Sequence, residues 1–237
     1  MRLLNVAIAV LSVSVMLCET AEANIIASST FNANSDGWLG VDLTYPTSGP
    51  PYSVLNTQVP DYNATGGNPG GYIQNSLDTP YPATFYWSAP SKFLGDVSGA
   101  YGGTLSFDLF DNPINNPYNQ EDIILTGGGK TVVFALTSNP GVNWTPYSIS
   151  LSEINWKLNT LTGSAATQAD MLTVLGNLSS LYIRGEYQIA ADTRGLDNVI
   201  LNGTAAVPEP SSLSLALLGL SLIPMVAVYR RRSKWIG

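Results

Sequence analysis

The sequence predicts an all-β protein, a β-sandwich with one short helix, enclosed between hydrophobic segments at the two ends of the chain. Short runs rich in Val, Ile, Phe, Tyr and Thr are separated by clusters of Gly, Pro, Asn and Asp. Several of these runs alternate apolar and polar residues with the period of a half-buried strand. An uncharged stretch at 211–229 sets the C-terminal end apart from this domain.

The run 104–109 gives the clearest strand pattern. Its leucines and phenylalanine occupy alternate positions, while Ser106 and Asp108 face the other way. Continuously apolar runs are typical of strands that are buried on both faces. Further strands are expected on these two grounds at 85–87, 131–136 and 147–152.

One helix interrupts the strands. Thr167 and Asp170 have the spacing of a capping box, and apolar residues follow at helical spacing, so the helix is expected to cover an open end of the sandwich. The next strand is predicted at 181–187, with Arg184 and Glu186 on its polar face. An exposed ion pair there contributes less than about 1 kcal/mol.

The N-terminal end has the pattern of a signal peptide. Met1-Arg2 precedes an apolar run, and Ala21-Glu22-Ala23 is a small-x-small cleavage site with Ala21 and Ala23 as the small residues. We therefore predict a signal peptide at 1–23 and a folded domain at 24–204. A lipoprotein at Cys18 is disfavoured, because Leu17 is bulkier than the residue expected before a lipidated cysteine.

The C-terminal end, 205–237, predicts a membrane helix at 211–229 followed by a basic tail at 230–237. As a helix, the uncharged stretch spans roughly 28 Å, close to the hydrocarbon thickness of a bilayer. Three arginines follow it and favour a cytoplasmic end. They are Arg230, Arg231 and Arg232.

The residues before this helix are Val207, Pro208, Glu209 and Pro210. Together with the helix and the arginines, they resemble the PEP-CTERM sorting tag of Gram-negative bacteria. The resemblance implies recognition and cleavage by a membrane enzyme, exosortase. The protein would be exported through the inner membrane, held transiently by 211–229, and then placed at the cell surface or outside the cell. The alternative is an ordinary C-terminal anchor for a periplasmic domain.

Charge and residue usage limit the functions of the domain. Region 24–207 has five basic and fourteen acidic residues, a net charge of −9, which argues against a nucleic-acid partner. A cation or an uncharged ligand fits better, and the acidity also favours solubility outside the cell. The chain has no His, and its one cysteine, Cys18, lies in the predicted signal peptide, so disulfides and zinc are not expected in the domain.

The absence of His and of a cysteine in the domain leaves only carboxylate catalysis. A glycosidase needs two carboxyl groups that face one bond, about 5 to 10 Å apart. Glu121 and Asp122 are adjacent, and neither Glu153 nor Glu186 has a visible partner. We therefore expect no enzymatic activity.

Short motifs follow one another along the domain. They are Asp36-Gly37-Trp38, Gly70-Gly71-Tyr72, Tyr86-Trp87-Ser88-Ala89-Pro90, Lys92-Phe93-Leu94-Gly95-Asp96, Tyr101-Gly102-Gly103, Asp122 to Gly127, Leu151-Ser152-Glu153-x-x-Trp156, Tyr182 to Tyr187 and Gly195 to Val199. Their order and spacing resemble the laminin B domain, also called laminin domain IV, from about Phe31 to Leu201. This resemblance implies a jelly-roll-like antiparallel β-sandwich similar to carbohydrate-binding modules, in extracellular matrix proteins with no assigned catalysis. The Cys-rich modules that flank this domain in animal laminins are absent here.

Two aromatic residues are candidates for ligand binding. Trp144 and Tyr118 lie in polar turns rich in Asn, Pro and Gly. An exposed aromatic ring has an apolar body and a polar edge, and it can stack on a sugar ring. An extracellular polysaccharide is therefore a candidate partner.

A structural Ca²⁺ site is a further expectation from the resemblance, since jelly-roll modules often hold one between their first and last strands. Asp36, Asp197 and Asn198 occupy the corresponding places. They supply the hard oxygen ligands that Ca²⁺ prefers.

Taken together, the sequence predicts an exported, non-catalytic surface or extracellular matrix protein, for example of a biofilm, that binds polysaccharide or another surface component. Two alternatives stay open: a carboxylate-dependent glycosidase that acts on such a polysaccharide, and a self-assembling structural surface protein.

Overall fold

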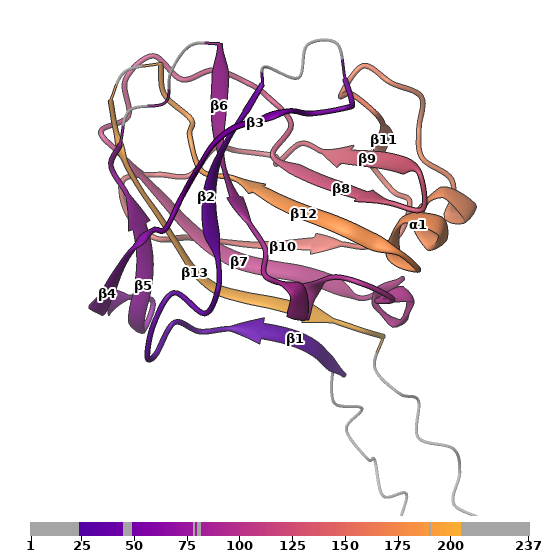
Figure 1. The fold of residues 1–237 in the computed structure, drawn as a ribbon, viewed down its shortest axis with the longest axis horizontal. Helices are drawn as coiled ribbons and strands as arrows, with labels where there is room; N and C mark the ends of the chain where they lie inside the picture. The colour runs from indigo at the N-terminus through magenta and orange to yellow at the C-terminus, as the bar shows by residue number, and fades with distance from the viewer. Residues whose placement is uncertain (1–23, 45–48, 78, 80–81, 190, 205–237) are drawn as a thin grey trace, which may run out of the picture. The chain divides into compact units, whose positions relative to one another are not determined.

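The described residues form a sandwich of two antiparallel sheets, as the sequence predicted (Figure 1). The computed structural model describes residues 24–44, 49–77, 79, 82–189 and 191–204. Sheet A consists, in order, of β10 (Thr145–Ser150), β7 (Thr104–Asn112), β13 (Thr193–Asn202), β5 (Gly70–Asn75) and β4 (Asp61–Gly67), and β1 (Ile25–Ser29) also pairs with β13. Sheet B consists, in order, of β11 (Lys157–Leu158), β9 (Lys130–Phe134), β8 (Ile123–Gly127), β12 (Leu178–Arg184), β6 (Ala83–Ser88), β2 (Leu39–Thr44) and β3 (Val54–Gln58).

The main core lies between the two sheets, where their alternating apolar side chains meet. In β7 the alternation is as predicted, since Leu105, Phe107 and Leu109 are buried and the serine and aspartate between them face outward. Trp38, Trp87 and Trp156 are also fully buried in this core. Because these tryptophans are fully buried, they fill the core and present no ring to a ligand at the surface.

The outer face of sheet B is covered by a second, smaller apolar cluster. Tyr52 and Leu161, from two loops, pack on five buried side chains there. The Tyr52 hydroxyl donates to the backbone oxygen of Asn159 at 3.0 Å, which ties these two loops together. Among the described residues, no such buried cluster lies on the outer face of sheet A. The two faces of the sandwich therefore differ in what they offer to solvent.

The helix is confirmed. In α1 (Gln168–Leu175) the Thr167 side chain accepts from the Asp170 backbone NH, and the Asp170 side chain accepts from the Thr167 backbone NH, so the capping box is complete. α1 lies against the hairpin of β8 and β9, as Figure 1 shows. The hairpin turns at Gly128 and Gly129, both with positive φ, a conformation that glycine adopts at no steric cost. Two short 3₁₀ helices, η2 (Ser91–Phe93) and η3 (Ser98–Ala100), link β6 to β7.

The two hydrophobic end segments lie outside the described residues. In the part of the chain that the structure describes, no helix is long and apolar enough to cross a membrane. The signal peptide at 1–23 and the membrane helix at 211–229 therefore stay predictions from the sequence, and the residues of the sorting motif also lie outside the described part of the chain.

Candidate functional site

Three aromatic side chains from separate segments meet on the outer face of sheet A. Trp144 lies just before β10, Phe110 in β7 and Tyr72 in β5, and all three are half-buried. The ring centroid of Trp144 is 4.7 Å from that of Phe110 and 5.2 Å from that of Tyr72, both edge-on. Phe110 and Tyr72 are 5.9 Å apart. We call these three residues the aromatic platform.

Backbone contacts hold the aromatic platform in place. Trp144 Nε1 donates to the Gly66 backbone oxygen, at the end of β4, at 2.8 Å. Phe110 is paired across the sheet with Gly195, where a Cβ atom would lie 2.1 Å from the phenylalanine ring. Only glycine leaves room for the ring to lie directly on β13. The Tyr72 hydroxyl donates to Gln74 at 2.9 Å, so each ring is fixed before any ligand arrives.

Of this platform, the sequence identified Trp144 alone. Phe110 extends the alternation of residues 104–109 by one outward position, and this signal could have found it. Tyr72 follows two glycines, and nothing local shows that it reaches Trp144. That contact depends on the order of the strands in sheet A, which the sequence does not reveal.

Two neighbouring carboxylates, Asp108 and Asp197, accept hydrogen bonds that fix the hairpin of β4 and β5 beside the platform. Asp108 and Asp197 are cross-strand neighbours on the outer face, and both are buried. Asp197 accepts from the backbone NH of Asn68, in the hairpin turn, at 2.6 Å. Asp108 accepts from the side-chain amides of Asn68 and Asn198, at 3.2 and 2.9 Å. These bonds hold the hairpin whose Gly66 oxygen fixes Trp144.

Burial, together with the charge of Asp108, raises the pKa of Asp197 to about 6. Between about pH 4 and pH 6, Asp197 is therefore protonated in the folded protein but ionised in the unfolded chain. The stability that this raised pKa contributes is full below about pH 4 and is lost as the pH rises through 6. We expect Asp197→Asn to raise the free energy of unfolding at pH 8 by about 2 kcal/mol, and to leave it unchanged at pH 4. Urea unfolding at the two pH values measures this. Asp61→Asn, at an exposed position of β4, is the control, and an equal effect of Asp197→Asn at both pH values would contradict the expectation.

The residues predicted to bind calcium fall into two hydrogen-bond networks. Asp36 accepts from the Ser29 hydroxyl at 2.8 Å and pairs with Lys92. Asp197 instead accepts from the Asn198 backbone NH at 2.7 Å, in the network around the carboxylate pair described above. Asp36 and Asn198 both have positive φ, which Asp and Asn tolerate in turns. Within the described ranges, no group of three or more His, Cys, Asp or Glu side chains could hold a metal ion. The calcium site stays a prediction that these bonds do not support.

The predicted exposed pair of Arg184 and Glu186 is wrong. Arg184 is fully buried at the end of β12, and its partner is Asp122, with Nη1 at 3.4 Å from Oδ1. Its Nε donates to the Glu186 backbone oxygen at 2.6 Å, and Nη2 donates to that of Tyr118 at 2.8 Å. The segment that carries Tyr118 covers this face of the strand, and strand alternation cannot reveal such a cover.

Tyr118 is therefore held by packing, unlike a ring in an open turn. The Arg184 guanidinium lies 4.4 Å from the centre of its ring, a cation–π contact that covers one face. Burial raises its pKa to about 12. A ligand could reach only the other face, so Trp144 is the stronger of the two predicted ligand contacts.

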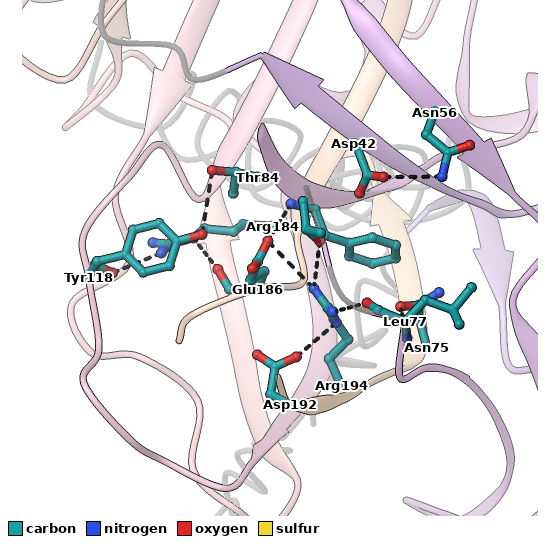
Figure 2. Close-up of polar contacts among 12 residues, drawn as sticks. Asp42, Asn56, Asn75, Leu77, Thr84, Tyr118, Arg184, Glu186, Asp192 and Arg194 are labelled. Carbon is teal, nitrogen blue, oxygen red and sulfur yellow. Dashed lines mark hydrogen bonds and ion pairs between the residues drawn. The ribbon is translucent and has the colours of Figure 1, made fainter. Parts of the chain in front are cut away.

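A second arginine is buried between the sheets, and Figure 2 shows its neighbours. Arg194 of β13 is 1% exposed. It lies between two buried carboxylates, with Nη1 at 3.6 Å from Glu186 Oε2 and Nε at 3.1 Å from Asp192 Oδ1. Nη2 donates to the Leu77 backbone oxygen at 2.6 Å, and the guanidinium lies 4.6 Å from the centre of the Phe85 ring. The Glu186 carboxylate thus pairs with Arg194, whereas Arg184 contacts only the Glu186 backbone oxygen.

The carboxylates considered for glycoside hydrolysis each bind different partners in separate parts of the domain. Glu121 accepts from the Leu161 backbone NH at 3.3 Å, while Asp122 pairs with the buried Arg184. Glu153 accepts from the Tyr101 hydroxyl at 2.5 Å, on another loop. These contacts do not bring Glu121, Asp122 and Glu153 together around one bond.

Comparison with known proteins gives two family matches. The model for "Laminin B (Domain IV)" matches residues 86–217, and the model for "PEP-CTERM protein-sorting motif" matches residues 206–233. Both resemblances seen in the sequence are therefore confirmed.

The curated relatives are much longer than this chain. The mouse (Mus musculus) basement membrane-specific heparan sulfate proteoglycan core protein is 31% identical over 136 residues, which cover 56% of this chain and 4% of that protein. Mouse laminin subunit alpha-1 is 29% identical over 147 residues, which cover 58% of this chain and 5% of that subunit. The chain thus spans about one twentieth of their length.

Among solved structures, the L4b domain of human laminin alpha-2 matches with a TM-score of 0.58 and 19% identity, over 75% of this chain and 97% of that domain. This likeness shows that the two share a fold. The family match covers more than half of the chain, and the sorting motif adds export to the cell surface or the extracellular space. The chain belongs to the laminin B (domain IV) family, in an exported protein with a PEP-CTERM sorting motif.

Proposed function

We propose that this chain is a non-catalytic surface or extracellular matrix protein that is released by an exosortase and binds an uncharged polysaccharide on the outer face of sheet A. The observation that carries the proposal is the aromatic platform, in which three half-buried rings from separate segments meet on a sheet face. Aromatic side chains offer sugars an apolar surface at low conformational cost.

Charge narrows the ligand class. The region 24–207 has a net charge of −9, so a polyanionic polysaccharide would be repelled over most of its approach. An uncharged polymer meets no such barrier. The outer face of sheet B is covered by Tyr52 and Leu161, which supports a single binding face.

The test uses the processed protein purified from its own host, together with the extracellular polysaccharide of that host. Anion exchange separates the polysaccharide into a neutral and an acidic fraction. We expect the protein to bind the neutral fraction, and Trp144→Ala to weaken this binding at least tenfold, about 1.4 kcal/mol. Affinity electrophoresis measures the binding, and circular dichroism checks the fold.

Tyr182→Ala is the matched control, because Tyr182 is a half-buried aromatic residue packed edge-on against Tyr86 in sheet B. It should bind like the unaltered protein. Binding of neither fraction would overturn the proposal, and so would unchanged binding by a folded Trp144→Ala variant. Hydrolysis of the polysaccharide by the protein would instead favour the glycosidase.

A further inference from the structure

A groove runs along β10, the edge strand of sheet A. Its volume is about 340 Å³, at the small end of the range for ligand sites. Phe134, Tyr147 and Ile149 supply aromatic and aliphatic surface. Ser148, Ser150 and Asn155 supply hydroxyl and amide groups.

The residues that line the groove are all uncharged. An uncharged groove in an acidic domain offers no counter-charge to an ionic ligand. It favours ligands that combine apolar surface with neutral hydrogen-bonding groups. Burial raises the pKa of the Tyr147 phenol to about 12, so this ring is also neutral at ordinary pH. Ring surfaces beside hydroxyl and amide groups are the chemistry that an uncharged sugar requires.

The walls of the groove are fixed before binding. The Tyr147 hydroxyl donates to the Ser138 backbone oxygen at 3.1 Å, and Trp156 Nε1 donates to that of Ser150 at 2.9 Å. The Phe134 ring packs against Trp156, with centroids 5.2 Å apart. Because these side chains are already fixed, a ligand loses little free energy in ordering them, and the entropic cost of binding is low.

The groove and the aromatic platform share β10. Side chains alternate along a strand, so Trp144, Pro146 and Ser148 lie on the same side of it. Pro146 and Ser148 line the groove, and Trp144 belongs to the platform. Tyr147 and Ile149 face the other side of β10, opposite the core residues Phe107 and Leu105, so the groove takes lining residues from both sides of the strand. A polymer that follows the chain from Trp144 to Ser150 would pass along about 20 Å, which is longer than a single sugar ring.

We infer that the aromatic platform and the β10 groove together form one elongated site, which binds an internal stretch of an uncharged polysaccharide chain and not its end. The inference rests on the proposed function and deepens it. It assigns binding roles to Tyr147, Ser148 and Asn155, which are distinct from the aromatic platform.

The test compares fragments of the neutral host polysaccharide by isothermal titration calorimetry with the processed protein. Partial acid hydrolysis and size fractionation give a disaccharide pool and a hexasaccharide pool. We expect the hexasaccharides to bind at least tenfold more tightly per molecule. Ser148→Trp should block the groove and remove most of this gain, while the weak binding of disaccharides at the platform stays.

If Ser148→Trp does not fold, Thr137→Trp takes its place, because Thr137 also lines the groove and a tryptophan there should block it from another position. The matched control is Thr57→Trp, at an exposed position of the edge strand β3. Equal affinity for short and long fragments, or full hexasaccharide binding by a folded groove variant, would overturn the elongated site and leave the proposed function standing. Failure of the whole neutral polysaccharide to bind overturns the proposed function itself, and the elongated site with it.

Discussion

Replacing Arg194 by methionine is expected to lower the free energy of unfolding by about 3 to 5 kcal/mol. Methionine keeps most of the volume but removes the charge that lies between Glu186 and Asp192. Both carboxylates are less than one tenth exposed, so water cannot replace the guanidinium. Denaturant unfolding at pH 7, with comparison of midpoint and slope, measures the loss.

Lys92→Met is the matched control. Lys92 also pairs with an aspartate, Asp36, but the two side chains are 38% and 40% exposed. Removal of such a pair costs less than about 1 kcal/mol. Similar losses for Lys92→Met and Arg194→Met would show that burial does not set the strength of these pairs, contrary to expectation.

The effect of Arg194→Met should depend on pH. Burial raises the pKa of Glu186, so its neutral form is favoured in the folded protein. The stability contributed by this raised pKa is full at low pH and is lost as pH rises through the folded value. The arginine offsets this loss in the unaltered protein, so the two proteins should differ most at neutral pH and less at pH 4.

Replacing Pro208, Glu209 and Pro210 by alanine is expected to abolish release of the protein almost completely. An exosortase would no longer recognise the motif, while the apolar segment 211–229 is unchanged and would hold the chain in the inner membrane. Mass spectrometry of the C-terminal peptide, in membrane and outer-surface fractions, measures this. The unaltered protein should end near Pro208 to Pro210 outside, and the variant should keep Gly237.

A variant with alanine at Ser211 and Ser212 controls for substitution close to the motif. It should be released like the unaltered protein. An intact Gly237 in the inner membrane for the unaltered protein would make the segment an ordinary anchor, and the search for a polysaccharide would then move to the periplasm.

Local pattern was sufficient for much of the fold. Alternation placed the core residues of β7, and the capping box placed the start of α1 at Thr167. These features depend on neighbours in the sequence. The strand predicted at 181–187 instead spans Leu178–Arg184, because the chain pairs with β8 from Leu178 onward.

Contacts between distant segments could not be predicted from local pattern. Alternation correctly set Arg184 opposite Ile183, but only the fold shows that the chain around Tyr118 covers that face. Asp36 and Asp197 come from the first and last parts of the domain, as predicted, yet each finds hydrogen-bond donors of its own. Trp144 was identified from its polar loop, whereas its partners on other strands were not.

The ends of the described domain lie beside each other. β1 and β13 are antiparallel neighbours, with Ile25 opposite Asn202, and the Gly203 backbone NH donates to the Asn24 oxygen at 2.7 Å. A unit whose chain enters and leaves at one point can be inserted into a longer polypeptide without disturbing what precedes or follows it. This geometry gives a physical reason why a similar segment can occupy a few per cent of a much longer proteoglycan core protein or laminin subunit and can also precede a sorting motif here. It also marks the junction of residues 24 and 203 as a place where the chain can be joined and reopened elsewhere by circular permutation.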